Sequence, residues 1–434
     1  MRGGLASIAI KIFGLGFSLL TAIILARTLG PEQYGVYSYV LAIVSILAIP
    51  AMFGLPSLIV RETAKAEAKQ EWGKMRGLWF WANSITASLS LVIAVIAALV
   101  LWLNRENFTE MQFLTFAWGI AFIPLSALAA LRGASLRGLR KVIQGQLPEQ
   151  VLKPALFILM LVAVGLTGFT QLTAESAMML NALSAGVAFI FGAWLLLRVK
   201  PKRLNSIEKE FERKAWIASV IPLALYSSIV VLNNQVDLVM LGILGTDADV
   251  GIYRIASQGA VLISIALEAM NAITSPHFSR LYAQKNMAAF QELTTQSTRL
   301  SFSFALPSAI ILIVFGQEIL SFVFGDAYLL GYITLVILVL SQVIHTGVGV
   351  AAALLNMSGY EKMSMYILGS TVICNVVLNF VLIPLYGMEG AAVATAIAIL
   401  IRKIILWITA YRVLGVDTSF IGMFYDRKKI IFKG

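Results

Sequence analysis

Apolar runs long enough to cross a membrane recur along the whole sequence. A helix of about 18 or more apolar residues crosses a hydrocarbon core of about 30 Å. Inside lipid the backbone must satisfy its own hydrogen bonds, and these runs are too long and continuous for barrel strands, so we expect helices. The composition agrees, because only 13% of the 434 residues are charged, about half the fraction of a soluble domain. The expected spans lie at about 5–26, 36–60, 78–103, 112–131, 148–168, 176–197, 216–244, 252–275, 300–324, 329–356, 363–385 and 390–412.

The two halves of the chain repeat each other. Residues 29–37 and 241–253 both read Leu-Gly, a short polar turn and Gly-aliphatic-Tyr, at an offset of about 216 residues that also relates the spans. Because each half holds an even number of spans, the repeats run in parallel. We predict an all-α integral membrane fold of twelve transmembrane helices, in two six-helix bundles related by a pseudo-twofold axis along the membrane normal. Its parts are an N-terminal lobe (1–198), a cytoplasmic basic linker (199–215), a C-terminal lobe (216–412) and a cytoplasmic tail (413–434).

Lys and Arg collect in one set of loops, which places both termini in the cytoplasm. They include Arg132 and its neighbours after the fourth span and the basic end of the tail. This distribution between apolar runs argues against a nucleic-acid partner, despite the net charge of +11. Loops 61–77 and 276–299 are predicted to be amphipathic helices on the anionic inner surface.

Few residues suggest chemistry. A single cysteine, Cys374, excludes an intramolecular disulfide, and the two histidines, His277 and His345, have no metal-ligand spacing. The sequence has no GxxxxGK[ST] phosphate loop and no nucleophile–base pair that spacing supports. We expect a transporter rather than an enzyme, with no catalytic residues, cofactor or metal.

Four segments resemble a known family. They are residues 26–35 (Ala-Arg-Thr-Leu-Gly-Pro-Glu-Gln-Tyr-Gly), residues 237–242 followed by Gly-Ile-Tyr at 251–253, residues 315–328, and residues 379–392, the most specific. Together they are similar to the Wzx-type oligosaccharide flippases, which share a superfamily with the MATE drug exporters and the lipid II flippases. The resemblance implies a multi-pass protein of a prokaryotic inner membrane, acting in surface polysaccharide biosynthesis such as that of O-antigen. It would flip a polyprenyl-diphosphate-linked oligosaccharide to the outer leaflet by alternating access, driven by an ion gradient or the membrane potential. Na⁺ or H⁺, membrane lipids, and the polymerase or chain-length machinery are the implied partners.

Insertion of a charged side chain at the middle of a membrane span costs at least about 2.5–3.5 kcal/mol of free energy, so we assign each such residue a structural or functional role. A cationic lining for the diphosphate would come from Lys11, Arg27, Lys153, Arg254 and Arg402. The alternative for the four nearest the interfaces is that they snorkel as anchors. Asp237 and Glu268 are candidates for coupling or gating, although Asp237 could instead form a structural bridge to Arg254. Asn233, Asn234, Asn375 and Asn379 offer hydrogen bonds to neighbouring helices or to sugar hydroxyls, and of these two roles we expect the bonds between helices.

Two other functions stay open at this point. A MATE-like exporter of small cations would need an acidic rather than a basic cavity. A membrane polysaccharide polymerase or glycosyltransferase would need a large outer loop or a soluble domain, and the outer connections between the expected spans are only about 4–9 residues long.

Overall fold

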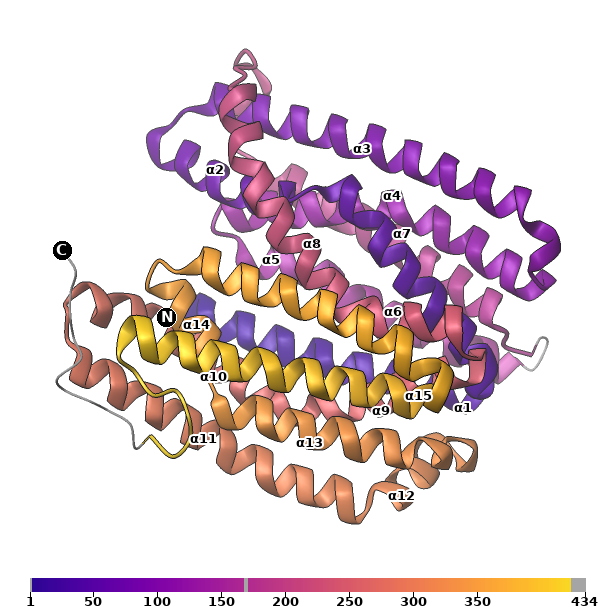
Figure 1. Ribbon diagram of the computed structural model, residues 1–434. Coiled ribbons are helices and arrows are strands. Elements are labelled where there is room, and N and C mark those ends of the chain that lie inside the picture. The colour runs from indigo at the N-terminus through magenta and orange to yellow at the C-terminus, as the bar shows by residue number, and fades with distance from the viewer. Residues whose placement is uncertain (1, 168–170, 423–434) are drawn as a thin grey trace. The chain divides into compact units, whose positions relative to one another are not determined.

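A computed structural model describes residues 2–167 and 171–422, and within these ranges every regular element is helical (Figure 1). Ten of the described helices are long and apolar enough to cross a membrane. The protein is therefore a multi-pass, all-α membrane protein. These helices are Ala9–Met52, Trp72–Leu103, Glu110–Gly138, Val142–Leu166, Ala174–Val199, Arg213–Leu244, Asp247–Ala283, Met287–Val314, Asp326–Val348 and Glu361–Leu414.

Two of these helices are interrupted by a glycine. Helix α1 (Arg2–Met52) leaves helical geometry at Gly30, with φ 70° and ψ 175°. Helix α15 (Glu361–Leu414) does so at Gly387, with φ 56° and ψ −132°. Only glycine adopts such positive φ values without steric cost. Both breaks coincide with turns expected between two spans, so ten long helices, two of them interrupted, occur among the described residues where the sequence predicts twelve spans. Pro124, Pro222 and Pro307 lie inside their helices without ending them.

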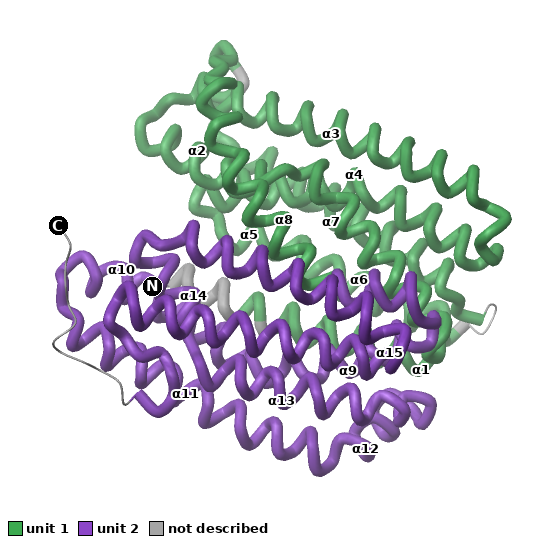
Figure 2. Tube along the Cα trace, in the orientation of Figure 1, with its two compact units in different colours: residues 1–235 green, residues 236–434 purple. Residues whose placement is uncertain are grey.

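The chain forms two compact units, residues 1–235 and 236–434 (Figure 2). The division falls inside helix α8 (Arg213–Leu244). Besides α1 and the first part of α8, unit 1 holds α2 (Leu55–Lys69), α3 (Trp72–Leu103), α4 (Glu110–Gly138), α5 (Val142–Leu147), α6 (Lys153–Thr167) and α7 (Ala174–Val199). Unit 2 holds α9 (Asp247–Val261), α10 (Ile265–Ala283), α11 (Met287–Val314), α12 (Gly316–Ile319), α13 (Tyr332–Val348), α14 (Ala351–Met357) and α15.

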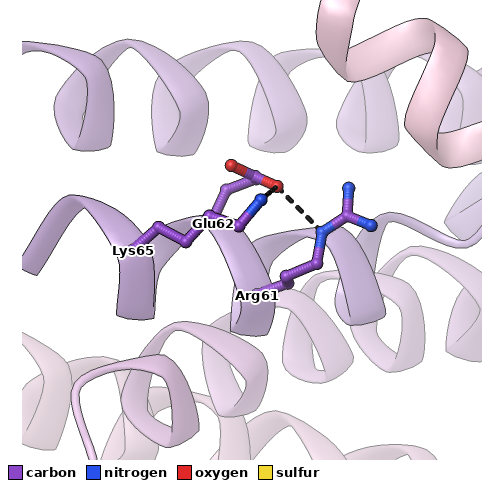
Figure 3. A network of polar contacts seen from close by, with 3 residues as sticks. All are labelled: Arg61, Glu62 and Lys65. Atoms are coloured by element: carbon purple, nitrogen blue, oxygen red, sulfur yellow. Dashed lines mark hydrogen bonds and ion pairs between the residues drawn. The ribbon is translucent and has the colours of Figure 1, made fainter. Parts of the chain in front are cut away.

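Helix α2 shows how unit 1 uses an amphipathic segment. Its apolar face, with Leu55, Leu58 and Ile59, is buried against side chains of α3, α4 and the start of α8. On its polar face, Glu62 Oε1 accepts from Arg61 Nε at 2.8 Å and from Lys65 Nζ at 3.0 Å (Figure 3). Of the predicted amphipathic segment 61–77, residues 61–69 are helical in α2, and their buried Ala66 packs on protein, with Met75, Leu139 and Leu204. Residues 72–77 belong to α3.

The matching prediction for residues 276–299 is wrong. Helix α10 continues to Ala283 and α11 begins at Met287, so no separate surface helix lies between them. The apolar residues of this segment pack inside unit 2, where Phe278 and Phe290 are both fully buried, with ring centroids 5.5 Å apart. Burial of these two rings explains why the helices extend into the expected loop.

The end of the described chain, residues 415–422, is fastened to unit 2, and we call it the C-terminal strap. Gln291 and Asp417 exchange two hydrogen bonds, of 2.8 and 2.9 Å, between the Gln291 amide and the Asp417 backbone. Thr298 Oγ1 donates to the Thr418 carbonyl at 3.1 Å, and the Phe420 ring stacks on Phe302 at 4.5 Å. The first part of the expected tail (413–434) therefore lies against unit 2, and its assignment as a cytoplasmic tail stays a prediction. The basic residues predicted beyond the strap lie outside the described residues.

Candidate functional site

The carboxylate of Asp237 lies at the centre of a polar cluster inside unit 2. Its Oδ2 accepts hydrogen bonds from Tyr253 Oη at 3.0 Å and from Thr395 Oγ1 at 2.7 Å, and its Oδ1 accepts from Asn379 Nδ2 at 2.8 Å. Asn379 also donates to Asn375 Oδ1. We call these five residues the Asp237 cluster. They bring three helices, α8, α9 and α15, to one carboxylate.

Local sequence explains this convergence. Asn375 and Asn379 are four residues apart and therefore share one face of α15. The break at Gly387 turns the chain, so that Thr395, from the other arm of α15, reaches the same carboxylate. Tyr253 returns to Asp237 because α9 starts close after α8, where Thr246 caps α9 by accepting from Asp249 N at 3.2 Å.

The cluster encloses a carboxyl group that has no cationic partner within the described part of the chain. Asn379 is fully buried, and Tyr253 and Asn375 are only 2% and 6% exposed. All the hydrogen bonds to Asp237 come from neutral groups, and no ion pair among the described residues includes it. In addition, Asn379 Oδ1 is a buried acceptor without a donor. A buried carboxylate and an unpaired carbonyl oxygen are both stabilised by a cation.

These hydrogen bonds test two predictions made from the sequence, one for Asp237 and one for Asn379. The proposed bridge from Asp237 to Arg254 is wrong, because the neighbouring Tyr253 takes that place. The expectation that Asn379 joins neighbouring helices is confirmed by its bond to Asp237 on α8. Thr395 was missed, because a lone threonine in an apolar run gives no signal until the break at Gly387 is known.

A second charged group of unit 2 surrounds Lys403. This residue is only 3% exposed, and its Nζ donates to the Gly349 carbonyl at 3.0 Å. Two residues predicted from sequence, Arg402 and Glu268, interact with it electrostatically. Glu268 itself is exposed on α10 and Arg402 is half-buried. Lys403 was overlooked because adjacent residues of a helix point about 100° apart, and only Arg402 was assigned a role.

In unit 1 the buried charge belongs to an arginine. Arg132 is 4% exposed; its Nη2 pairs with Glu149 Oε1 at 2.8 Å and its Nη1 donates to the Phe189 carbonyl at 2.7 Å. Gly192 on α7 leaves room for it, since a Cβ there would collide with the guanidinium. The sequence predicts Arg132 in a basic loop after the fourth span. The structure corrects this, because α4 continues to Gly138.

The remaining predicted cations of the substrate lining are spread over both units. Lys153 lies over the Phe122 ring, with 4.4 Å from Nζ to the centroid, close enough to Glu149 to interact with its charge. Lys11 and Arg27 are exposed on α1, and Arg254 is half-buried on α9. Their role in binding a diphosphate stays a prediction.

Comparison with known proteins identifies the family. Residues 1–282 match the family described as polysaccharide biosynthesis protein, and residues 222–381 match MatE. The chain belongs to the polysaccharide biosynthesis protein family.

Relatives of this family member are similar over most of its length. The probable low-salt glycan biosynthesis flippase Agl15 of Haloferax volcanii is 24% identical over 91% of this chain and 80% of its own. A solved structure of the lipid II flippase MurJ, in an inward closed conformation, gives a TM-score of 0.72 at 15% identity, covering 94% of this chain and 87% of that one. An inward-facing multidrug resistance MATE family transporter also gives 0.72, at 17% identity over 93% of this chain and 96% of that one. These two structures establish a fold shared with the MATE and MurJ transporters.

Proposed function

We propose that this family member is a flippase, which moves a polyprenyl-diphosphate-linked oligosaccharide from the inner to the outer leaflet of a prokaryotic cytoplasmic membrane. The observation that carries the proposal is the similarity over 91% of the chain to a glycan biosynthesis flippase. The transported lipid would supply surface polysaccharide biosynthesis. The chain acts as a transporter in this proposal and not as an enzyme.

The proposed architecture has twelve spans in two lobes, 1–198 and 216–412, joined by the basic linker 199–215. Division of α1 at Gly30 and of α15 at Gly387 supports this count, because each helix is longer than one membrane crossing needs: 51 and 54 residues against about 20. The basic loops support cytoplasmic termini. Alternating access would then follow from movement of one repeat against the other.

Energy would enter at the Asp237 cluster. In the absence of a cation the cluster holds an anion among neutral donors, so binding of Na⁺ or H⁺ would lower the free energy of that state. Oxygen atoms of Asp237, Thr395 and Asn379 are hard ligands suited to Na⁺, and the carboxylate alone suffices for H⁺. Lys11, Arg27, Lys153, Arg254 and Arg402 remain the proposed cationic lining for the diphosphate.

A strain that lacks the gene tests the function directly. We expect lipid-linked oligosaccharide to accumulate in the inner leaflet, measured as glycolipid inaccessible to an external glycosidase, and surface glycan to disappear. Re-expression of the wild-type gene should restore both. Normal surface glycan in the deletion strain would contradict the proposal.

The driving ion is tested separately. Purified protein in liposomes should flip the lipid at a rate that depends on an imposed Na⁺ gradient or on an imposed H⁺ gradient. A rate that responds to neither gradient, nor to a membrane potential, would remove ion coupling while leaving flipping intact.

One observation favours a second function. The MatE match over residues 222–381 includes the whole Asp237 cluster except Thr395. A cation-coupled exporter of small molecules would use the same cluster for coupling. It would be preferred if the liposomes expelled a cationic dye against Na⁺ or H⁺ and left the glycolipid in place.

A further inference from the structure

A pocket of about 440 Å³ lies in unit 1, between the first turns of α3 and the basic linker. Three cationic side chains line it, Arg76 from α3 and Lys200 and Lys209 from the linker. The aromatic residues Trp79 and Phe80 form another part of the lining. The volume lies within the range of small-molecule sites. None of these residues belongs to the Asp237 cluster or to the proposed cationic lining for the diphosphate.

The linker is folded onto α3 rather than hanging free. Glu210 N donates to the Gly73 carbonyl at 3.1 Å, and Arg76 Nη1 donates to the Ile207 carbonyl. Leu204 is 5% exposed and packs in a core cluster with Met75 and Leu139. The pocket is therefore a built site, formed by two segments that are more than a hundred residues apart in sequence.

The charge of the pocket selects an anion. Its lining, all within the described residues, contains no acidic side chain. Two of the three acidic residues of the linker have other partners, since Glu212 pairs with Lys74 at 2.8 Å and the Glu210 carboxylate lies against Gly73. The third, Glu208, is exposed and does not line the pocket. Lys209 Nζ lies 3.4 Å from the centre of the Phe80 ring, which holds one cation in place. Two lysines and an arginine at close range suit a phosphate group.

The pocket continues into an apolar surface. Phe80 is exposed, and farther along the same face of α3 so are Leu91, Val95 and Leu99, at 61%, 60% and 54%. Leu91, Val95 and Leu99 are four residues apart and form one stripe. The stripe begins about 16 Å along the helix from Phe80, beyond the exposed residues Ser84 and Ser88. A ligand with a phosphate at the pocket and an apolar chain along the stripe would satisfy both surfaces.

We propose that this pocket binds the phosphate headgroup of an anionic phospholipid, with an acyl chain along the exposed stripe of α3. The inference rests on the proposed orientation, which places the linker at the cytoplasmic leaflet, where anionic lipids attract basic residues. Aromatic residues such as Trp79 and Phe80 are typical of that interface. The bound lipid would stabilise the contact between the linker and α3, close to the residues where the linker continues into α8.

Lipid binding to the purified full-length protein tests this proposal without any transport measurement. Native mass spectrometry would follow titration with short-chain phosphatidylglycerol, phosphatidylcholine or glycerol 1-phosphate. We expect phosphatidylglycerol to bind at least tenfold more tightly than either of the others. Equal binding of phosphatidylcholine would overturn the anionic selection, and equal binding of glycerol 1-phosphate would reduce the pocket to a site for free phosphate.

The double substitution K200Q/K209Q should weaken phosphatidylglycerol binding about 25-fold, or about fivefold for each charge near the surface. Arg76 is kept, because it bonds the Ile207 carbonyl and its loss could unfold the linker. The matched control K202Q/R203Q removes two exposed charges of the same linker that do not line the pocket, and should change binding less than twofold. An equal loss in both variants would overturn the pocket in favour of general surface charge. Since transport is not the readout, a failure here is separate from a failure of the proposed flippase function.

Discussion

The two units treat a buried charge in opposite ways. In unit 1, Arg132 is paired with Glu149 at 2.8 Å and also donates to two backbone carbonyls, so its charge is balanced by the protein itself. In unit 2, Asp237 is surrounded by a tyrosine, a threonine and an asparagine, all neutral. A buried charge that is paired within the protein acts as a structural contact between helices. A buried carboxylate without a cationic partner is stabilised when it binds a cation. The contrast separates a structural ion pair from a candidate coupling site.

The largest effect should follow the loss of Arg132. Arg132→Ala would leave Glu149 and two carbonyls without their donor, at a cost of about 3 kcal/mol in the free energy of unfolding. Thermal unfolding of the purified protein in detergent measures this. Glu149→Gln is the matched variant: it keeps an acceptor for Arg132 but removes the counter-charge, so its cost should be smaller, about 2 kcal/mol. An equal cost for both variants would show that the arginine is not the centre of the network.

Asp237→Asn should have the opposite effect on stability. It removes an uncompensated charge while keeping the side-chain shape, so the protein without added cation should be as stable as the wild type or more stable. Transport should fall by about 100-fold, near the upper end of known coupling energies. The stabilisation of the folded protein by Na⁺ or by acid should disappear, since an ion stabilises the folded state only if it binds to it.

The control for this substitution is Asp249→Asn, which alters only the cap of α9. It should leave both transport and the response to cations within twofold of the wild type. A D237N variant that transports at the wild-type rate would contradict the contrast between the units, because the buried carboxylate would then have no role in coupling.

A smaller effect is expected at Thr395, which donates to Asp237 at 2.7 Å. Thr395→Val removes one oxygen from the cluster and should weaken cation binding about tenfold, or about 1.4 kcal/mol. Thr371→Val is matched to it, because that hydroxyl, on the same helix, donates only to the Ile367 carbonyl of its own helix. Isothermal titration with Na⁺, repeated at several pH values, would compare the two variants; equal affinities would remove Thr395 from the site.

The smallest effect concerns the two helix breaks. An alanine at Gly30 or Gly387 would meet no atom within 4 Å, so its cost is that of the backbone conformation alone, about 1–3 kcal/mol. Both variants should lose similar stability on heating. Only Gly387→Ala should also weaken cation binding, because that break brings Thr395 to Asp237. A loss of binding in Gly30→Ala would show that the cluster depends on more than its own unit.

Features with a local cause could be predicted from the sequence. The positions of the apolar runs, the turns at Gly30 and Gly387, and the candidates Asp237, Asn375 and Asn379 all follow from hydropathy and from the cost of polar groups in lipid. The partners of Asp237 could not be predicted, because they depend on the direction in which α15 continues after its break. Arg132 was misplaced for a related reason, since a basic residue near the end of an apolar run fits a loop as well as a helix.

The C-terminal strap has a consequence for the order of synthesis. Gln291 and Thr298 emerge from the ribosome before their partners Asp417 and Thr418, which follow 126 and 120 residues later. Until then the polar side chains of α11 must bond to water, to lipid headgroups or to a chaperone, because buried polar groups need partners. Unit 2 can therefore complete its packing only after its last helix has been inserted, and a chain cut before residue 415 would be a substrate for quality-control proteases.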